Sequence, residues 1–151
     1  MNELLDRIFY FINNEVRSAR IPFGIIVGDA RGGKTSAMRT LLNRMRKEDY
    51  KLLDLEENPE LIDNFMKEVE KLAKCKKIKN KPSLLVIDHF NWFLLFSKFS
   101  GNNAKSVIKK IRYFARSINL PTVMILTRTN YIEEVLKDLK REDPSIKILY
   151  L

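Results

Sequence analysis

Residues 28–35 have the types and spacing of a loop that binds phosphate groups. Their sequence, Gly-Asp-Ala-Arg-Gly-Gly-Lys-Thr, fills the pattern G-x-x-x-x-G-K-[ST]. In this pattern the glycines allow backbone N–H groups to surround and bind the phosphates. The lysine contacts the terminal phosphates, and the hydroxyl of the Ser or Thr binds Mg²⁺. The alternative is a glycine-rich turn without a ligand. We expect ATP to bind through the following residues: Gly28, Asp29, Ala30, Arg31, Gly32, Gly33, Lys34, Thr35 and Ser36.

Asp88 has the type and position of a residue that holds Mg²⁺. It ends an apolar run, residues 84–87, downstream of the phosphate loop. A carboxylate at this place bonds the waters of the ion, while the Thr35 hydroxyl binds the ion directly. The expected metal site therefore consists of Thr35 and Asp88. The alternative role for Asp88 is to cap the segment that follows it.

Glu56 and Glu57 are the candidates for acid–base chemistry. They follow the segment that reads as a second strand, residues 50–55. One of these carboxylates can orient and polarise a water for attack on a phosphate. An acidic pair in front of a helix also stabilises the helix dipole. The spacing leaves both roles open.

Alternating strands and helices are expected to position these residues. The loop follows the β-branched run at 23–27 and opens a helical pattern, which places it at a helix N-terminus that favours anions. Apolar periodicity and turn residues predict strands at 23–27, 50–55, 83–88, 122–127 and 146–150. The same signals predict helices at 2–18, 34–47, 59–74, 104–119 and 131–140.

This order of elements predicts an α/β fold with a three-layer sandwich and a mainly parallel five-stranded sheet. The crossovers should be right-handed, and the ligand should lie at the carboxyl ends of the strands. We expect one domain over residues 1–151, with residues 1–20 forming an amphipathic helix ahead of the core. The apolar stripe of that helix either packs on its own sheet or docks on a neighbouring subunit.

Composition limits the setting in which the chain works. The 151 residues are 45% hydrophobic, and the formal net charge is +9, which favours anionic partners. The single cysteine, Cys75, supports neither an internal disulfide nor a zinc site. No apolar run approaches the ~20 residues that span a bilayer. We expect a cytoplasmic protein that does not bind membranes.

Two basic stretches and one aromatic stretch suggest contact with nucleic acid. Lysines crowd residues 71–81, and the helix at 104–119 carries Lys105, Lys109, Lys110, Arg112 and Arg116. Either group can neutralise phosphates, although runs of charge also occur on ordinary solvated surfaces. Residues 89–99 are rich in aromatic rings, which either stack on unpaired bases or pack against the core. His89, the only histidine, is expected to make a local hydrogen bond near the phosphates.

Several segments resemble the ATPases of the RecA superfamily, including KaiC-like and RadA-like proteins and the bacterial replicative helicases. The resemblance covers residues 21–130, and beyond the phosphate loop and residues 84–88 it rests on residues 53–62 and 111–123. It implies that Glu56 is the catalytic glutamate and Glu57 its contributing neighbour. It also implies that Lys34 acts on the phosphates during turnover.

Departures from that family pattern are also clear. Where the helicases place a glutamine that senses the γ-phosphate, this chain has Arg128 within Thr127-Arg128-Thr129-Asn130, and it contains no glutamine. Arg128 is expected either to contact phosphate or to face solvent. The resemblance implies a homo-oligomer in which a neighbour donates a cation, and it would place that cation among Lys140, Arg141 and Lys147.

The expected function is a Mg²⁺-dependent ATPase that is oligomeric and coupled to DNA with little sequence specificity. A first alternative is a regulatory or assembly module that binds ATP and a protein partner and hydrolyses slowly. A second alternative is a small-molecule kinase, which the Leu-Glu-Glu junction at 55–57 disfavours.

Overall fold

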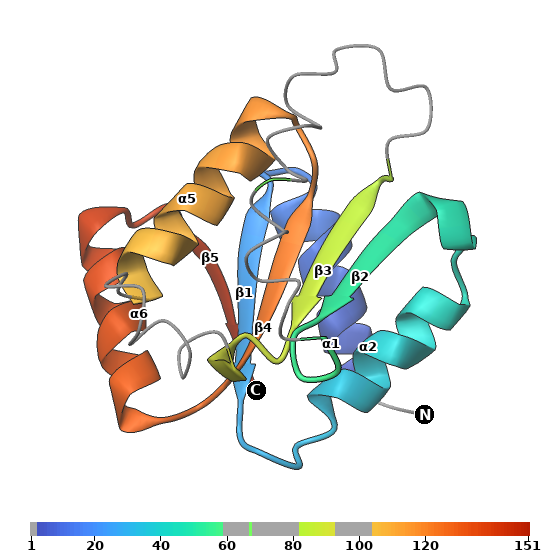
Figure 1. Ribbon diagram of the computed structural model, residues 1–151, viewed down its shortest axis with the longest axis horizontal. Helices are drawn as coiled ribbons and strands as arrows, with labels where there is room; N and C mark the ends of the chain where they lie inside the picture. Colours follow the sequence, from blue (N-terminus) through green and yellow to red (C-terminus); the bar gives the residue numbers. More distant parts are fainter. Residues whose placement is uncertain (1–2, 59–66, 68–81, 93–103) are drawn as a thin grey trace.

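The computed structural model describes residues 3–58, 67, 82–92 and 104–151 (Figure 1). Within these ranges the chain forms one sheet of five parallel strands in the order β2-β3-β4-β1-β5. The strands are β1 (Phe23–Gly28), β2 (Tyr50–Asp54), β3 (Leu84–Asp88), β4 (Thr122–Thr127) and β5 (Lys147–Tyr150). The helical segments are α1 (Glu3–Tyr10), η1 (Phe11–Val16), α2 (Lys34–Asn43), η2 (Lys47–Asp49), α5 (Ala104–Ser117) and α6 (Asn130–Glu142).

The central strands are apolar because both of their faces are covered. Every residue of β1 and of β3 is buried. Side chains alternate between the two faces of a strand, and in β1 Ile25 and Val27 belong to one core cluster while Ile26 belongs to another. Continuous apolar runs of this kind are typical of parallel sheets with helices on both faces.

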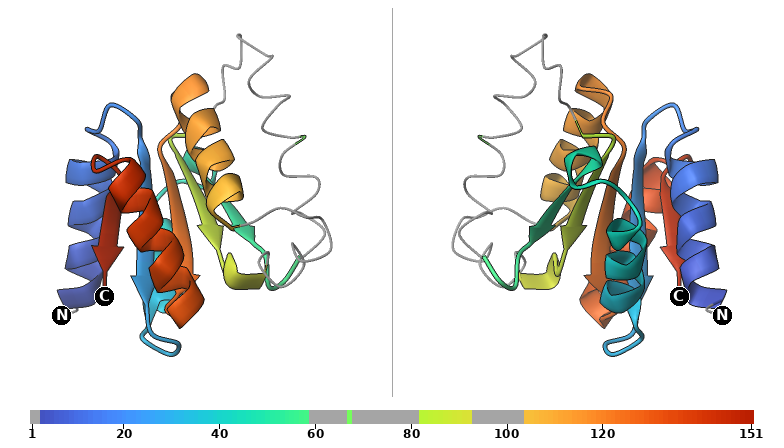
Figure 2. Two further views of the ribbon diagram at one scale, coloured as in Figure 1. Left: turned by 90° about the vertical axis from the view of Figure 1, so that its left-hand side faces the viewer. Right: turned by 90° about the vertical axis from the view of Figure 1, so that its right-hand side faces the viewer.

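The helices divide into two layers. Helices α5 and α6 contribute to the core cluster on one face, and α1, η1 and α2 contribute to the cluster on the opposite face. Figure 2 shows α1 and α5 on opposite sides of the sheet. The α/β class and the parallel five-stranded sheet expected from the sequence are therefore confirmed.

The N-terminal helical segment packs on the sheet of its own chain. Its buried residues, Leu5, Ile8, Phe11, Ile12 and Val16, join the same cluster as α2. The second half of the segment, η1, is a π-helix rather than the expected continuous α-helix. Gly24 of β1 permits the close approach, because a Cβ there would lie 2.5 Å from Val16 Cγ2 and 2.9 Å from the Phe11 ring.

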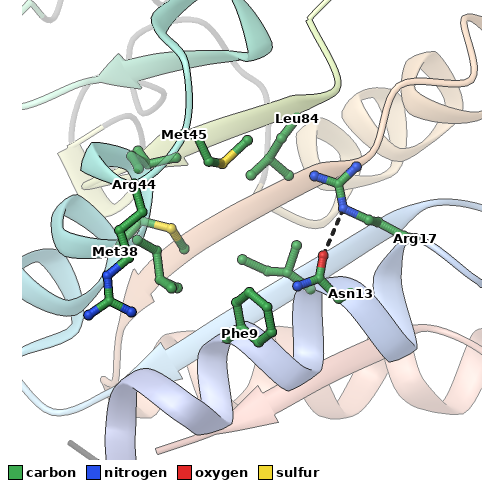
Figure 3. A pocket seen from close by; sticks show the side chains of 10 residues that line it. Phe9, Asn13, Arg17, Met38, Arg44, Met45 and Leu84 are labelled. Carbon is green, nitrogen blue, oxygen red and sulfur yellow. Dashed lines mark hydrogen bonds between the residues drawn. The ribbon is translucent and has the colours of Figure 1, made fainter. Parts of the chain in front are cut away.

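A groove of about 240 Å³ lies between this N-terminal segment and α2. Figure 3 shows Phe9 and Asn13 on one side and Met38 and Met45 on the other, with Leu84 at the sheet. Arg17 donates a hydrogen bond from Nε to Asn13 Oδ1 at 3.1 Å, and another from Nη1 to the Ser83 carbonyl at 3.0 Å. The groove is thus mainly apolar, with arginine at its margin.

The sheet order creates a crevice where β1 and β4 end. These two strands are neighbours, but α2 follows β1 onto one face and α6 follows β4 onto the other. The chain segments leaving the two strands therefore diverge. A point of this kind, outside the carboxyl ends of the strands, is where open α/β sheets bind ligands.

The observed elements differ from the expected ones mainly at their ends. Helix α2 ends at Asn43 rather than near residue 47, and β5 begins at Lys147. Apart from Lys67, the helix expected at 59–74 lies outside the described residues, as do the lysines of 71–81, Cys75 and most of the aromatic stretch, residues 93–99.

Candidate functional site

A cavity of about 480 Å³ opens at the carboxyl ends of the strands, the lower edge of the sheet in Figure 2. It joins the loop after β1 to residues at the ends of β2, β3 and β4. Its lining consists of Ala30, Arg31, Gly32, Gly33, Lys34, Thr35, Ser36, Glu56, Asp88, His89, Ile125 and Thr127. Most of the residues that the sequence marked for chemistry are therefore brought together, and they surround one space.

The loop before α2 has the backbone shape of an anion cradle. Gly33 is the N-cap of α2 with φ of 83°, a conformation that suits glycine, and Arg31 also has positive φ, at 65°. Among the described residues, no side chain caps this helix end. Because the first N–H groups of a helix have no partner within the helix, they are available to phosphate oxygens, and the helix dipole favours negative charge there.

Lys34 is held inside the loop. Its side chain is buried, and Nζ donates to the carbonyl oxygen of Asp29 at 2.6 Å. Burial lowers the pKa of Lys34, and the negative charges of Asp88 and Asp29 oppose that effect. A phosphate chain beside Nζ adds negative charge and so favours the charged form of the amine.

Asp88 ends β3 with a carboxylate that is only partly bonded. The residue is 1% exposed. Its Oδ1 accepts a hydrogen bond from the His89 backbone N–H at 2.7 Å, while Oδ2 is buried and has no hydrogen-bond partner among the described residues. An unpaired buried carboxylate oxygen is costly unless a cation is bound beside it. Together with the Thr35 hydroxyl in the same lining, this oxygen fits Mg²⁺, which prefers oxygen ligands.

Asp54, His89 and Glu56 form a chain of contacts beside Asp88. Asp54 pairs with Asp88 in the register of β2 and β3 and is 7% exposed. His89 Nδ1 lies 2.9 Å from Asp54 Oδ1, and His89 Nε2 lies 3.1 Å from Glu56 Oε2. Arg39 donates from Nη2 to Asp54 Oδ2 at 2.7 Å. Asp54 was not predicted as a site residue, because the strand was expected to run to residue 55, whereas β2 ends at Asp54 itself.

The hydrogen bonds to Asp54 keep this carboxylate charged. Burial raises the pKa of Asp54, but the hydrogen bonds from His89 and from the N–H groups of Glu57 and Glu56 outweigh burial. They hold that pKa below its ordinary value. Asp54 is thus a fixed anionic anchor at the end of β2.

Two carboxylates and one imidazole could in principle share a metal ion. One ligand atom from each of Asp54, Asp88 and His89 lies within 4.8 Å of the others. However, Asp54 already accepts bonds from Arg39, His89 and two backbone N–H groups. Asp88 is therefore the member of this cluster with an oxygen left for a cation.

Glu56 and Glu57 differ in their position relative to the cavity. Glu56 lines the cavity and contacts His89, with its side chain 51% exposed. Glu57 is exposed and does not contribute to the lining; its backbone N–H donates to Asp54 Oδ1 at 3.3 Å. The geometry supports Glu56 as the candidate base, whereas within the part of the chain that the structure describes Glu57 contributes a backbone hydrogen bond.

Arg128 neither lines the cavity nor faces solvent freely. Its Nη1 lies 3.6 Å from Asp29 Oδ1, its Nε lies 3.4 Å from Glu133 Oε1, and its Nη2 donates to the Leu151 carbonyl at 3.1 Å. Asp29, in turn, belongs to the phosphate loop but not to the lining. Arg128 therefore contacts the loop from outside.

The basic residues of α5 are largely paired within the chain. Lys105 and Lys109 each place Nζ 2.6 Å from a different carboxylate oxygen of Glu142, and Arg112 bonds Asp143. The side chains of Lys110 and Arg116, on the same helix, make no hydrogen bond or ion pair with another described residue. The pairing reduces the charge that α5 offers to nucleic acid.

Other expected cations and aromatic rings are also placed. Lys140 donates from Nζ to the Ile146 carbonyl at 2.7 Å, and Arg141 pairs with Asp138. Phe90 is buried in the core while Trp92 is 38% exposed. The first ring of the aromatic stretch thus lies in the core, in agreement with the alternative that these rings pack against the core rather than stack on bases.

A comparison with models of known protein families and a comparison with curated protein sequences both return no match. None of the helices in the described ranges is both long and apolar enough to cross a bilayer.

Proposed function

We propose that this chain is a Mg²⁺-dependent ATPase. The observation that carries the proposal is one cavity that combines an uncapped helix N-terminus, the amine of Lys34, the unpaired oxygen of Asp88 and the carboxylate of Glu56. An anion cradle, a cation-binding acid and an acceptor for a proton are the parts that phosphoryl transfer to water requires.

The residues divide the work as follows. Backbone N–H groups of residues 30–36 and the Lys34 amine bind the phosphates, while Thr35 and Asp88 hold Mg²⁺, which supplies neutralisation of developing charge. Glu56 accepts a proton from a water whose oxygen bonds to the γ-phosphorus. The bond from the γ-phosphorus to the bridging oxygen breaks, and ADP and phosphate are released.

We extend the proposal to a RecA-like ATPase that forms homo-oligomers and acts on DNA. The resemblance of residues 53–62 and 111–123 to that superfamily and the net charge of +9 support it. The lysines of 71–81 are the main candidates for DNA contact, because three of the five basic residues of α5 pair with α6 and the residue after it.

That same pairing favours a second candidate function. A chain whose α5 charges are neutralised internally is suited to binding a protein partner, with ATP acting as a conformational clamp. This assembly module would bind Mg²⁺ and ATP through the same cavity but would turn over slowly and would not respond to DNA.

Phosphate release from ATP distinguishes these functions. We expect turnover by the full chain, stimulation by single-stranded DNA at low salt, and loss of that stimulation as salt rises. Glu56→Gln should lower kcat by about 100-fold or more while ATP still binds. The matched control is Glu48→Gln. Glu48 is exposed and precedes the start of β2, whereas Glu56 follows the end of that strand.

Turnover without any response to DNA would favour the assembly module. Transfer of the γ-phosphate to an added acceptor faster than to water would favour the kinase. Full activity of Glu56→Gln would contradict the role of Glu56.

A further inference from the structure

We propose that His89 is a positioning residue that holds the Glu56 carboxylate in place for attack by water. This inference rests on the proposed ATPase function and adds a residue to its machinery. The turn that carries Glu56 follows β2, and His89 directly follows Asp88 at the end of the neighbouring strand β3. One imidazole therefore joins the ends of the two strands that supply the acid for the metal and the base for water.

The two ring nitrogens of His89 have different tasks. Nδ1 lies 2.9 Å from Asp54 Oδ1, and Nε2 lies 3.1 Å from Glu56 Oε2. Asp54 is itself fixed, because Arg39 bonds its Oδ2 and the N–H groups of Glu56 and Glu57 bond its Oδ1. The Nδ1 side is thus anchored to a buried group, and the Nε2 side is directed at an exposed one.

The backbone of His89 supports the same assignment. Its φ is 56°, in the left-handed region that non-glycine residues rarely adopt. The conformation is stabilised by the bond from its N–H to Asp88 Oδ1 at 2.7 Å. Strained conformations of this kind persist where the surrounding structure fixes them, and they concentrate at functional sites. Here the left-handed residue sits in the cavity lining, between Asp54 and Glu56.

Glu56 needs such support because it lies outside regular structure. Its side chain is 51% exposed and belongs to the turn after β2. A free glutamate side chain populates several rotamers, and confining it costs conformational entropy. A general base must lie within hydrogen-bond reach of its water, so a contact that confines Glu56 before ATP arrives raises kcat rather than affinity.

Two substitutions separate the two sides of the ring. The amide nitrogen of asparagine superposes on Nδ1, so His89→Asn keeps a donor for Asp54 and also tolerates positive φ. It does not reach Glu56. The amide nitrogen of glutamine superposes on Nε2, so His89→Gln places an N–H donor beside Glu56 and gives up the anchor to Asp54.

The experiment measures kcat and KM for ATP in the full chain and in these variants. We expect His89→Asn to lower kcat by about 10- to 100-fold, the cost of a misplaced catalytic group, and to change KM by less than about threefold. His89→Gln should retain more of kcat than His89→Asn. Equal unfolding midpoints for His89→Asn and the wild type verify that the fold is intact.

The double variant His89→Asn with Glu56→Gln tests whether His89 acts through Glu56. In a chain that already lacks the base, adding His89→Asn should change kcat by less than about twofold. Equal losses in the two backgrounds would overturn the proposal, because His89 would then act independently of Glu56.

A spectroscopic measurement gives an independent readout. His89 is the only histidine, so a nitrogen-detected NMR experiment on nucleotide-free protein reports one imidazole. At one fixed pH, Glu56→Gln should shift the Nε2 resonance more than the Nδ1 resonance. An unchanged imidazole spectrum would overturn the contact on which the proposal depends.

The two proposals fail in different ways. Absence of ATP hydrolysis by the folded wild-type chain would overturn the proposed function, and this role with it. Normal wild-type turnover together with an unimpaired His89→Asn variant would overturn the role of His89 alone.

Discussion

At the scale of the residue, the site depends on how completely each buried charge is paired. Asp54 and Asp88 are neighbours across two strands, and both are buried. Asp54 is surrounded by donors, whereas Oδ2 of Asp88 accepts no hydrogen bond within the described ranges. The two carboxylates therefore have different tasks, Asp54 as an anchor and Asp88 as a ligand.

This difference predicts the effect of Asp88→Asn. The variant keeps the acceptor for the His89 N–H but loses the charge that holds Mg²⁺. In the wild type, Mg²⁺ should strengthen ATP binding. In Asp88→Asn we expect this gain in affinity to be about 10- to 100-fold smaller. The unfolding midpoint of the metal-free protein should not fall, because the variant removes a buried negative charge whose Oδ2 has no hydrogen-bond partner in the described ranges.

Calorimetric titration of ATP with Mg²⁺ and with a chelator measures the effect, and Asp49→Asn before β2 is the control. If Asp88→Asn lowers the unfolding midpoint and leaves the Mg²⁺ dependence intact, Asp88 is a structural cap.

Which site residues could be predicted from sequence depends on how local their signals are. The phosphate loop and Asp88 are marked by neighbours in the chain: a strand before the glycines, and an apolar run before the acid. The contact of His89 with Asp54 joins residues 35 positions apart. It depends on the register of β2 with β3, which no local pattern encodes.

At the scale of the element, the N-terminal segment illustrates the limit of periodicity. Its apolar spacing predicted a helix, and helical turns are present over α1 and η1. The change to π-helix at Phe11 was not predictable, because the apolar pattern of residues 2–18 is compatible with α-helix throughout. The structure also resolves the alternative about its stripe, which packs against its own sheet.

The contact between this segment and β1 predicts that Gly24→Ala destabilises the fold. A methyl group there would lie 2.5 Å from Val16 Cγ2, so η1 or the strand must move. We expect a loss of about 1–3 kcal/mol in the free energy of unfolding, measured by urea denaturation. In a Val16→Ala background the same substitution should cost less. A Gly24→Ala variant as stable as the wild type would show that η1 does not pack this closely.

The clamp between α5 and α6 predicts a dependence of stability on pH. Hydrogen bonds from Lys105 and Lys109 lower the pKa of Glu142 from 4.5 to about 2. Because the folded-state value is below the unfolded one, the contribution of Glu142 is complete above pH 4.5 and is lost as the pH falls towards about 2.

Urea unfolding of the wild type and Glu142→Gln across this range measures the contribution. The difference in their unfolding free energies should shrink as the pH falls, and it should be reduced by salt because Glu142 is exposed. Glu134→Gln, at another exposed position of α6, is the control. A difference that stays constant with pH would contradict the assignment.

At the scale of the whole molecule, the fold follows from a few strong signals. Fully apolar runs predicted strands that the sheet buries on both faces, as β1 and β3 confirm. Alternation of strands and helices predicted parallel pairing. The distribution of charge was less predictable: the partners of Lys105, Lys109 and Arg112 lie more than 30 residues away in sequence. Basic residues that suggest a free charged surface in the sequence are thus partly paired with acidic residues in the folded chain.

The whole arrangement has one central requirement, which is that the cavity at the strand ends binds Mg²⁺ and ATP together. Titration calorimetry of the folded full chain tests it most directly, with Lys34→Ala as the variant and Lys137→Ala, an exposed residue of α6, as the control. We predict one nucleotide bound per chain, and affinity more than about tenfold weaker in Lys34→Ala because charge-assisted hydrogen bonds to phosphate are lost. No heat of binding with ATP or ADP in the presence of Mg²⁺ would contradict the account.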